Sequence, residues 1–134
     1  MTIASFDDLL RAASQQTEAQ RLLFVFTTAE LPDDATPEQH ARFQAGEGGT
    51  LTPLMCVDKS PDELPSFEAL LAESRRAGPA WDIVFVAALS GSAGRNPTST
   101  DAAEPLERMV ESIKSGRIGS FIPFDVHGRP VRFG

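Results

Sequence analysis

Residue types that could support chemistry gather in the segment Ser90–Thr100, which contains two glycines, an arginine, an asparagine and several hydroxyls. It lies between an apolar run typical of a buried strand and a predicted helix, where open α/β sheets bind ligands and helix amides attract phosphate. It lacks the Lys-Ser/Thr pair of a P-loop, and Asp101 and Glu104 already place negative charge at the helix start. Connections of about 11 residues are either functional or disordered in compact domains, and both interpretations stay open. The ligand-binding residues that we predict here are Ser90, Gly91, Gly94, Arg95 and Asn96.

The single cysteine, Cys56, lies near the carboxyl end of a second predicted strand, close to Asp58 and Lys59. A nearby cation favours the reactive thiolate of a cysteine. A free cysteine within an apolar strand is more often a small buried hydrophobe, and this is the interpretation that we prefer for Cys56. Cys56 and Asp58 join the ligand-binding hypothesis, which requires this strand end to meet the segment Ser90–Thr100.

His40 and His127 are the only histidines, and neither falls in a metal-ligand spacing. The sequence has no paired cysteines, no Asp-x-Asp-x-Asp-Gly run and no Gly-x-Ser-x-Gly motif. We therefore predict no metal site and no cofactor, and we expect both histidines on the surface. Since no catalytic constellation is visible, the sequence favours a protein that is not an enzyme.

Alternating helices and strands must position these residues. Apolar spacing and capping residues predict helices over 5–16, 36–46, 66–77 and 101–115, with a short helical turn at 60–63. Strands are predicted over 22–26, 51–57, 82–89 and 118–126, followed by a tight turn at 127–128 and a return strand over 129–133. The runs at 22–26 and 82–89 are apolar on both faces, so we expect them to be central. Pro53 and Pro123 favour edge positions for the other two strands.

This alternation indicates an α/β or α+β fold. A chain of 134 residues supports one hydrophobic core, so we predict a single layered domain over residues 1–134. We expect a mixed sheet of about four or five strands with about four helices, and a C-terminal hairpin at one edge. The strand order stays open.

The charge balance narrows the function classes. The chain has 12 Lys and Arg against 19 Asp and Glu, a net charge of −7, which argues against nucleic acid and against anionic membranes as partners. No apolar run approaches the roughly 20 residues of a membrane-spanning helix, and the acidic start is unlike a signal peptide. One cysteine fits a reducing compartment, so we expect a cytoplasmic protein.

The charge is also unevenly distributed along the chain. Residues up to 107 include 7 basic and 17 acidic side chains, whereas residues 108–134 include 5 basic and 2 acidic ones. The basic end could form an amphipathic surface for an acidic partner or for a second copy of the chain. The alternative is that its arginines pair internally with the acidic part. The predicted interface residues are Arg117, Phe121, Arg129, Arg132 and Phe133.

Four segments carry a resemblance to a known family; they are Leu23–Pro32, Leu51–Lys59, Phe85–Gly91 and Gly116–Asp125. Through them the whole chain resembles a family of short proteobacterial proteins of unknown function, whose members often carry the label "ribonucleotide reductase subunit alpha". Such a reductase needs a radical-bearing cysteine and a redox-active cysteine pair, and this chain has one cysteine. The resemblance therefore implies a cytoplasmic bacterial protein and transfers no functional residue.

Two hypotheses about function follow. The preferred one is a non-catalytic protein that acts by association, as a homodimer or with a protein partner, through the C-terminal edge and its arginines. The alternative is a small-molecule or anion-binding protein, conceivably an enzyme, that uses the loop over residues 90–100.

Overall fold

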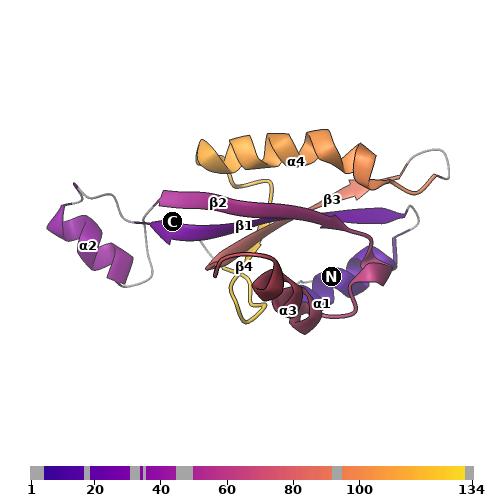
Figure 1. The fold of residues 1–134 in the computed structure, drawn as a ribbon, viewed down its shortest axis with the longest axis horizontal. Coiled ribbons are helices and arrows are strands. Elements are labelled where there is room, and N and C mark those ends of the chain that lie inside the picture. Colours follow the sequence, from indigo (N-terminus) through magenta and orange to yellow (C-terminus); the bar gives the residue numbers. More distant parts are fainter. Residues whose placement is uncertain are drawn as a thin grey trace.

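An antiparallel four-stranded sheet carries the fold of the computed structural model, which describes residues 5–16, 19–30, 34, 36–44, 50–91 and 95–131 (Figure 1). The strands are β1 (Gln20–Glu30), β2 (Thr50–Lys59), β3 (Ile83–Ser90) and β4 (Ile122–Phe124), in the order β2-β1-β3-β4. The predicted fold class is confirmed, and of its two alternatives the chain adopts α+β. Among the described strands every pairing is antiparallel, so the parallel pair that a mixed sheet would contain is not found.

Helices cover both faces of this sheet. Figure 1 shows α4 (Ser99–Lys114) on one side, α1 (Phe6–Ser14) and α3 (Phe67–Ala77) on the other, and α2 (Pro37–Gln44) beyond the end of β1 and the start of β2. The short 3₁₀ turn η1 (Pro61–Glu63) follows β2. These positions confirm the four predicted helices and the helical turn. Among the described helices, none combines the length and apolar character of a membrane-spanning segment.

Local capping explains where the helices begin. The side chains of Ser5 and Ser66 accept hydrogen bonds from backbone N–H groups three residues ahead, at 3.3 and 3.2 Å. In α4 the cap is Thr98, because the Asp101 carboxylate returns to the Thr98 N–H at 2.9 Å and completes a capping box. This reciprocal bonding starts α4 two residues earlier than predicted and shortens the connection after β3.

The central position of β1 follows from its apolar residues on both faces. Leu22, Phe24 and Phe26 belong to the cluster under α1 and α3, whereas Leu23 and Val25 belong to the cluster under α4. All five side chains are buried. Their alternation shows why a short, uniformly apolar run must lie between two layers.

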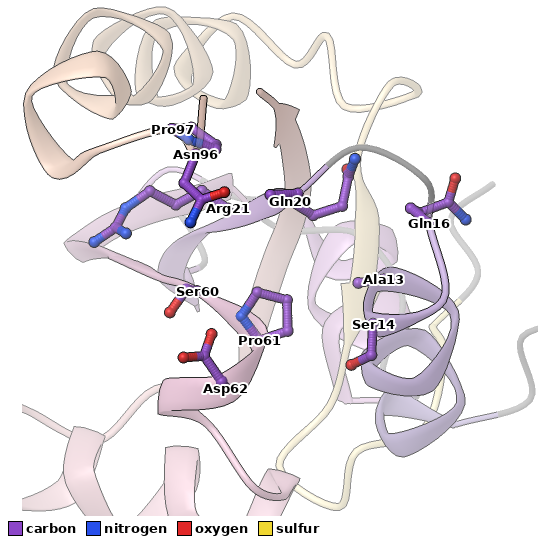
Figure 2. Close-up of a pocket in the computed structure, with 11 residues that line it drawn as sticks. Ala13, Ser14, Gln16, Gln20, Arg21, Ser60, Pro61, Asp62, Asn96 and Pro97 are labelled. Atoms are coloured by element: carbon purple, nitrogen blue, oxygen red, sulfur yellow. The ribbon is translucent and has the colours of Figure 1, made fainter. Parts of the chain in front are cut away.

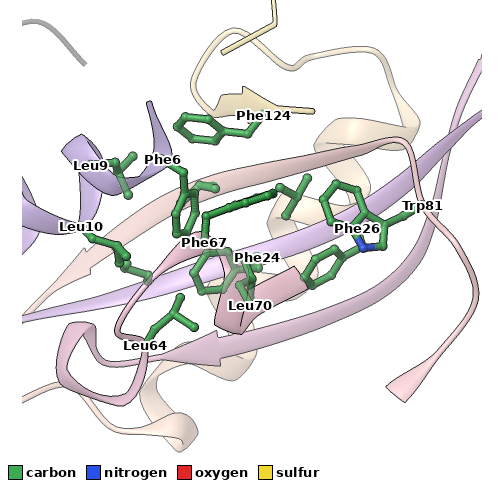
Figure 3. Packing of buried hydrophobic residues seen from close by; sticks show 13 residues of the cluster. Phe6, Leu9, Leu10, Phe24, Phe26, Leu64, Phe67, Leu70, Trp81 and Phe124 are labelled. Atoms are coloured by element: carbon green, nitrogen blue, oxygen red, sulfur yellow. The ribbon is translucent and has the colours of Figure 1, made fainter. Parts of the chain in front are cut away.

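Aromatic rings fill the core between the sheet, α1 and α3 (Figure 3). The Phe6 ring centroid lies 5.3 Å from that of Phe124, 5.4 Å from that of Phe67 and 6.0 Å from that of Phe24. Trp81 packs against Phe26 at 5.1 Å. Phe6 therefore joins α1 to α3 and β4 through edge contacts of the kind that aromatic rings favour, and to β1 through a tilted contact with Phe24.

The C-terminal strand is shorter than predicted. Residues 118–121 form a turn instead of a strand, and Ile118 and Phe121 pack against the cluster under α4, whereas Ile122 packs against the opposite cluster. The alternating apolar residues thus pack against the two core clusters on opposite sides of the sheet, although part of the segment is a turn and not a strand. After β4, Phe124 pairs with Pro130 in an isolated bridge, which forms a short hairpin at the sheet edge. The last part of the predicted return strand lies outside the described residues.

Replacing Phe6 with alanine should lower the free energy of unfolding by about 3–5 kcal/mol, because the ring is fully buried against three others and its loss leaves a cavity. Urea unfolding followed by circular dichroism measures this loss. Glu107→Ala on the exposed face of α4 is the control and should change stability by less than about 0.5 kcal/mol. Equal midpoints for the two variants would contradict the packing.

Candidate functional site

Three strand ends meet at one end of the sheet. β2 and β3 both run antiparallel to β1 and therefore end on the same side, where β1 begins. In the register, Gln20 pairs with Ser90 and Leu22 pairs with Lys59. The end of β2 and the segment after β3 are thus brought together, as the ligand-binding hypothesis requires.

A polar network ties these elements together. Arg21 Nε on β1 donates to Asp58 Oδ2 on β2 at 2.5 Å, and Arg21 Nη2 donates to Ser99 Oγ at the start of α4 at 2.7 Å. Ser99 Oγ in turn donates to Asp58 Oδ2 at 2.7 Å. The side chains of Arg21 and Asp58 are only 13% and 18% exposed. Two strands and a helix therefore hold one guanidinium group in a fixed position.

The electrostatics of the network keep Asp58 ionised. Burial raises the pKa of Asp58, but hydrogen bonds from Ser99 and Arg21 and the charge of Arg21 outweigh burial, and the pKa lies below its ordinary value. An acceptor with a lowered pKa is a poor general base. The Asp58–Ser99 pair is therefore suited to holding Arg21 in place, not to activating the Ser99 hydroxyl.

An open cleft of about 380 Å³ lies beside the network (Figure 2). Its walls come from the end of α1, the start of β1, the turn η1 and the segment before α4. The lining residues are Ala13, Ser14, Gln16, Ala19, Gln20, Arg21, Ser60, Pro61, Asp62, Asn96 and Pro97.

The segment 90–100 contributes unequally to this cleft. Asn96 lines the cleft, as predicted. Ser90 does not line it, but its Oγ accepts a hydrogen bond at 2.9 Å from Nε2 of the lining residue Gln20. Arg95 is exposed and does not line the cleft, and Gly94 lies outside the described residues. One predicted ligand-binding residue therefore borders the cavity directly.

Gly91 has a structural role. Its N–H donates to Ala19 O at 2.8 Å, and a Cβ at this position would lie 2.1 Å from Arg95 O. Only glycine permits this approach of two backbone segments. Gly91 therefore shapes the segment that carries Asn96.

Cys56 differs from the expected buried hydrophobe, because its side chain is exposed. It pairs with Val25, but β2 is an edge strand and has a neighbour on only one side. Cys56 shares a face of β2 with Asp58, two residues away, yet it does not line the cleft. The structure thus brings Asp58 to the site and leaves Cys56 outside it.

Three of the five predicted interface residues, Arg117, Phe121 and Arg129, lie within the described part of the chain. Arg117 and Arg129 are exposed and form no ion pair there, whereas Phe121 is partly buried against the cluster under α4. Arg132 and Phe133 lie outside the described part of the chain. The alternative of internal pairing with the acidic part is thus not found for these two arginines among the described residues.

The remaining candidates for chemistry are the two histidines and possible metal ligands. His40 and His127 are both exposed, as predicted. No group of three or more His, Cys, Asp or Glu side chains within the described ranges could hold a metal ion.

Sequence reasoning did not identify Arg21, Gln16, Gln20 or Asp62 as site residues. The sequence contained one signal for Arg21, which directly precedes the apolar run of a predicted buried strand. A charged side chain next to the core needs a polar partner when other elements pack over it. The other three are polar residues at element ends and have no distinguishing pattern. No family model matches this chain, and neither curated proteins nor solved structures show a similar protein.

Gly91→Ala should destabilise the chain by about 1–3 kcal/mol, because the added methyl group collides with the Arg95 carbonyl. Thermal unfolding measures the loss. Gly119→Ala is the matched control, since nothing lies within 4 Å of a Cβ at that position. If the two alanine variants unfold alike, the close approach at Gly91 is not a constraint.

Asp58→Asn should destabilise the chain near neutral pH and have less effect in acid. The pKa of Asp58 is lower in the folded chain, so its contribution to stability is present above the ordinary value of 3.8 and is lost as the pH falls through the folded value. Urea unfolding of the parent and variant at about pH 7 and about pH 3 tests this expectation. A stability difference that is the same at both pH values would contradict it.

Proposed function

We propose that this chain binds a small polar molecule in the cleft between η1, the start of β1 and the segment before α4. The observation that carries the proposal is the convergence of Asn96 with Arg21 and Ser60 around one cavity. In Figure 2 the Asn96 amide and the Asp62 carboxylate extend from opposite walls. A cavity of about 380 Å³ is within the range of roughly 300–1,000 Å³ that is typical of ligand pockets.

Preorganisation favours binding at this position. Arg21 is held by two acceptors, Asp58 and Ser99, so a ligand would not have to order this long side chain. Immobilising a side chain on binding costs about 0.5–1.5 kcal/mol, and this cost is already met in the free protein. Gly91 similarly allows the close packing of the segment that carries Asn96, and Ser90 holds the lining residue Gln20 through a hydrogen bond of 2.9 Å.

Binding fits the site better than catalysis does. Asp58 is ionised and hydrogen-bonded, and no histidine or cysteine is among the residues that line the cleft. The described lining therefore lacks the imidazole and thiol side chains that most often act as a general acid, base or nucleophile.

Association with an acidic protein partner is the second candidate, and exposed Arg117 and Arg129 favour it because they form no ion pair within the described ranges. Strand pairing is a poor route to such a contact. The outer side of β4 already receives the Val131 N–H at Pro123 O, at 3.0 Å. On β2, Pro53 and a register shift beside it interrupt the edge, as in strands protected from pairing.

A ¹⁵N-labelled sample titrated with a panel of neutral, zwitterionic and anionic fragments tests the proposed function. We expect amide shifts at Gln20, Ser60 and Asn96 for at least one class. Asn96→Ala should weaken that binding about tenfold, because the variant loses one hydrogen bond to the ligand. A tenfold change in affinity corresponds to about 1.4 kcal/mol.

Arg95→Ala is the matched control, because Arg95 adjoins Asn96 in sequence and does not line the cleft. Its affinity should equal that of the parent chain. If every fragment leaves the cleft amides unmoved, or if both alanine variants bind alike, the cleft is not the binding site.

A further inference from the structure

We infer that the ligand of this cleft is an uncharged planar heterocycle with an amide-like edge and adjacent N–H donors, the pattern of guanine-type and pterin-type rings. This inference rests on the proposed function and specifies the chemistry of the molecule that the cleft accepts. Three observations carry it: the charge balance of the lining, two polar side chains that make no hydrogen bond within the described residues, and apolar surfaces between them.

The charge balance disfavours an anion. Arg21 and Asp62 are the charged residues of the lining, and their charges cancel. Arg21 is already bonded to ionised Asp58, and its Nη1 lies 3.8 Å from Glu63 Oε1. A phosphate or carboxylate approaching Arg21 would meet these carboxylates, whose repulsion offsets the attraction of the guanidinium. A neutral ligand meets no such opposition.

Two lining side chains have hydrogen-bonding capacity to spare. Asn96 and Asp62 are exposed, and neither side chain makes a hydrogen bond within the described part of the chain. An asparagine amide offers a donor and an acceptor side by side, whereas an ionised carboxylate accepts two donors. Together they match a ring that presents a carbonyl or ring nitrogen to Asn96 and a pair of N–H groups to Asp62.

Flat apolar groups lie between these polar side chains. Figure 2 shows the Pro61 ring in the middle of the cleft, with Ala13 beyond it, and Pro97 beside Asn96. Pro97 is buried and Pro61 is partly buried. Proline and alanine surfaces favour the face of a planar ring, because such a face carries no hydrogen-bonding group that would lose water without compensation.

Titration of the full chain by calorimetry and by amide spectra tests the inference, with guanosine, neopterin, adenosine and guanosine 5′-monophosphate as probes. We expect guanosine or neopterin, or both, to shift the resonances of the cleft amides. Comparing the affinities of these two probes decides whether the ligand ring is a nucleobase or a pterin. Adenosine should bind at least about tenfold more weakly, because it does not present two adjacent donors to Asp62. The monophosphate should bind more weakly than guanosine because it adds negative charge.

Asp62→Asn should weaken binding of the preferred ring about tenfold or more, since the amide replaces one acceptor oxygen of the carboxylate with an NH₂ donor that would face a donor of the ring. Glu107→Gln on α4 makes the same chemical change away from the cleft and should leave the affinity unchanged. Asn96→Ala provides an independent variant if Asp62→Asn alters the amide spectrum of the free protein.

The outcomes separate this inference from the proposed function. If anionic or zwitterionic fragments shift the cleft amides and neither ring does, the ligand class is wrong and the proposed function stands. If adenosine binds as well as guanosine and neopterin, the role of Asp62 is wrong. If neither the rings nor any fragment shifts these amides, both the ligand class and the proposed function are overturned.

Discussion

Burial of β1 on both faces is the constraint on which the rest of the structure depends. Its apolar side chains alternate between two layers, and each layer needs its own cover, which α1 and α3 supply on one side and α4 on the other. A strand of this kind must also be paired on both edges, because its backbone groups have no access to water. β2 and β3 fulfil that requirement along most of its length.

The candidate site is a consequence of this arrangement. Because β2 and β3 flank β1 and both run opposite to it, their final residues and the first residues of β1 meet at one end. Arg21 lies at the start of β1, where the strand enters the core. The Asp58 carboxylate on the neighbouring strand balances its charge, and Ser99 at the start of α4 accepts a further hydrogen bond from it. The network therefore serves two purposes: it satisfies a charge near the core and it fixes one wall of the cleft.

The same geometry bears differently on the two ideas about function that the sequence allowed. Strand pairing through the C-terminal edge would need free backbone groups on β4, and residues that follow β4 already bond to that edge. Association through the exposed side chains of Arg117 and Arg129 needs no such backbone groups. The cleft, in contrast, presents Asn96 and Asp62 toward solvent beside groups that are held in place. The physical difference is that one backbone partner occupies the hydrogen-bonding groups of a strand edge, whereas a cleft remains accessible when the side chains around it are hydrogen-bonded to one another.

Local pattern determined the elements of this protein. The doubly apolar runs predicted β1 and β3 as central strands, the capping residue Ser5 predicted a helix start, and Pro53 predicted the edge position of β2; all of these are confirmed. These features depend on side-chain periodicity and on hydrogen bonds three residues apart, which a sequence displays directly.

Only the tertiary structure decided the strand order, the exposure of Cys56 and the partnership of Arg21 with Asp58. Arg21 and Asp58 are 37 residues apart, and Asp58 and Ser99 are 41 apart, so no local spacing relates them. Their meeting depends on which strands lie beside β1 and in what register, and many sequences with the same periodicity could pair differently. The chain's periodicity therefore determined which residues enter the core, and the packing of the core decided which polar residues meet at its end.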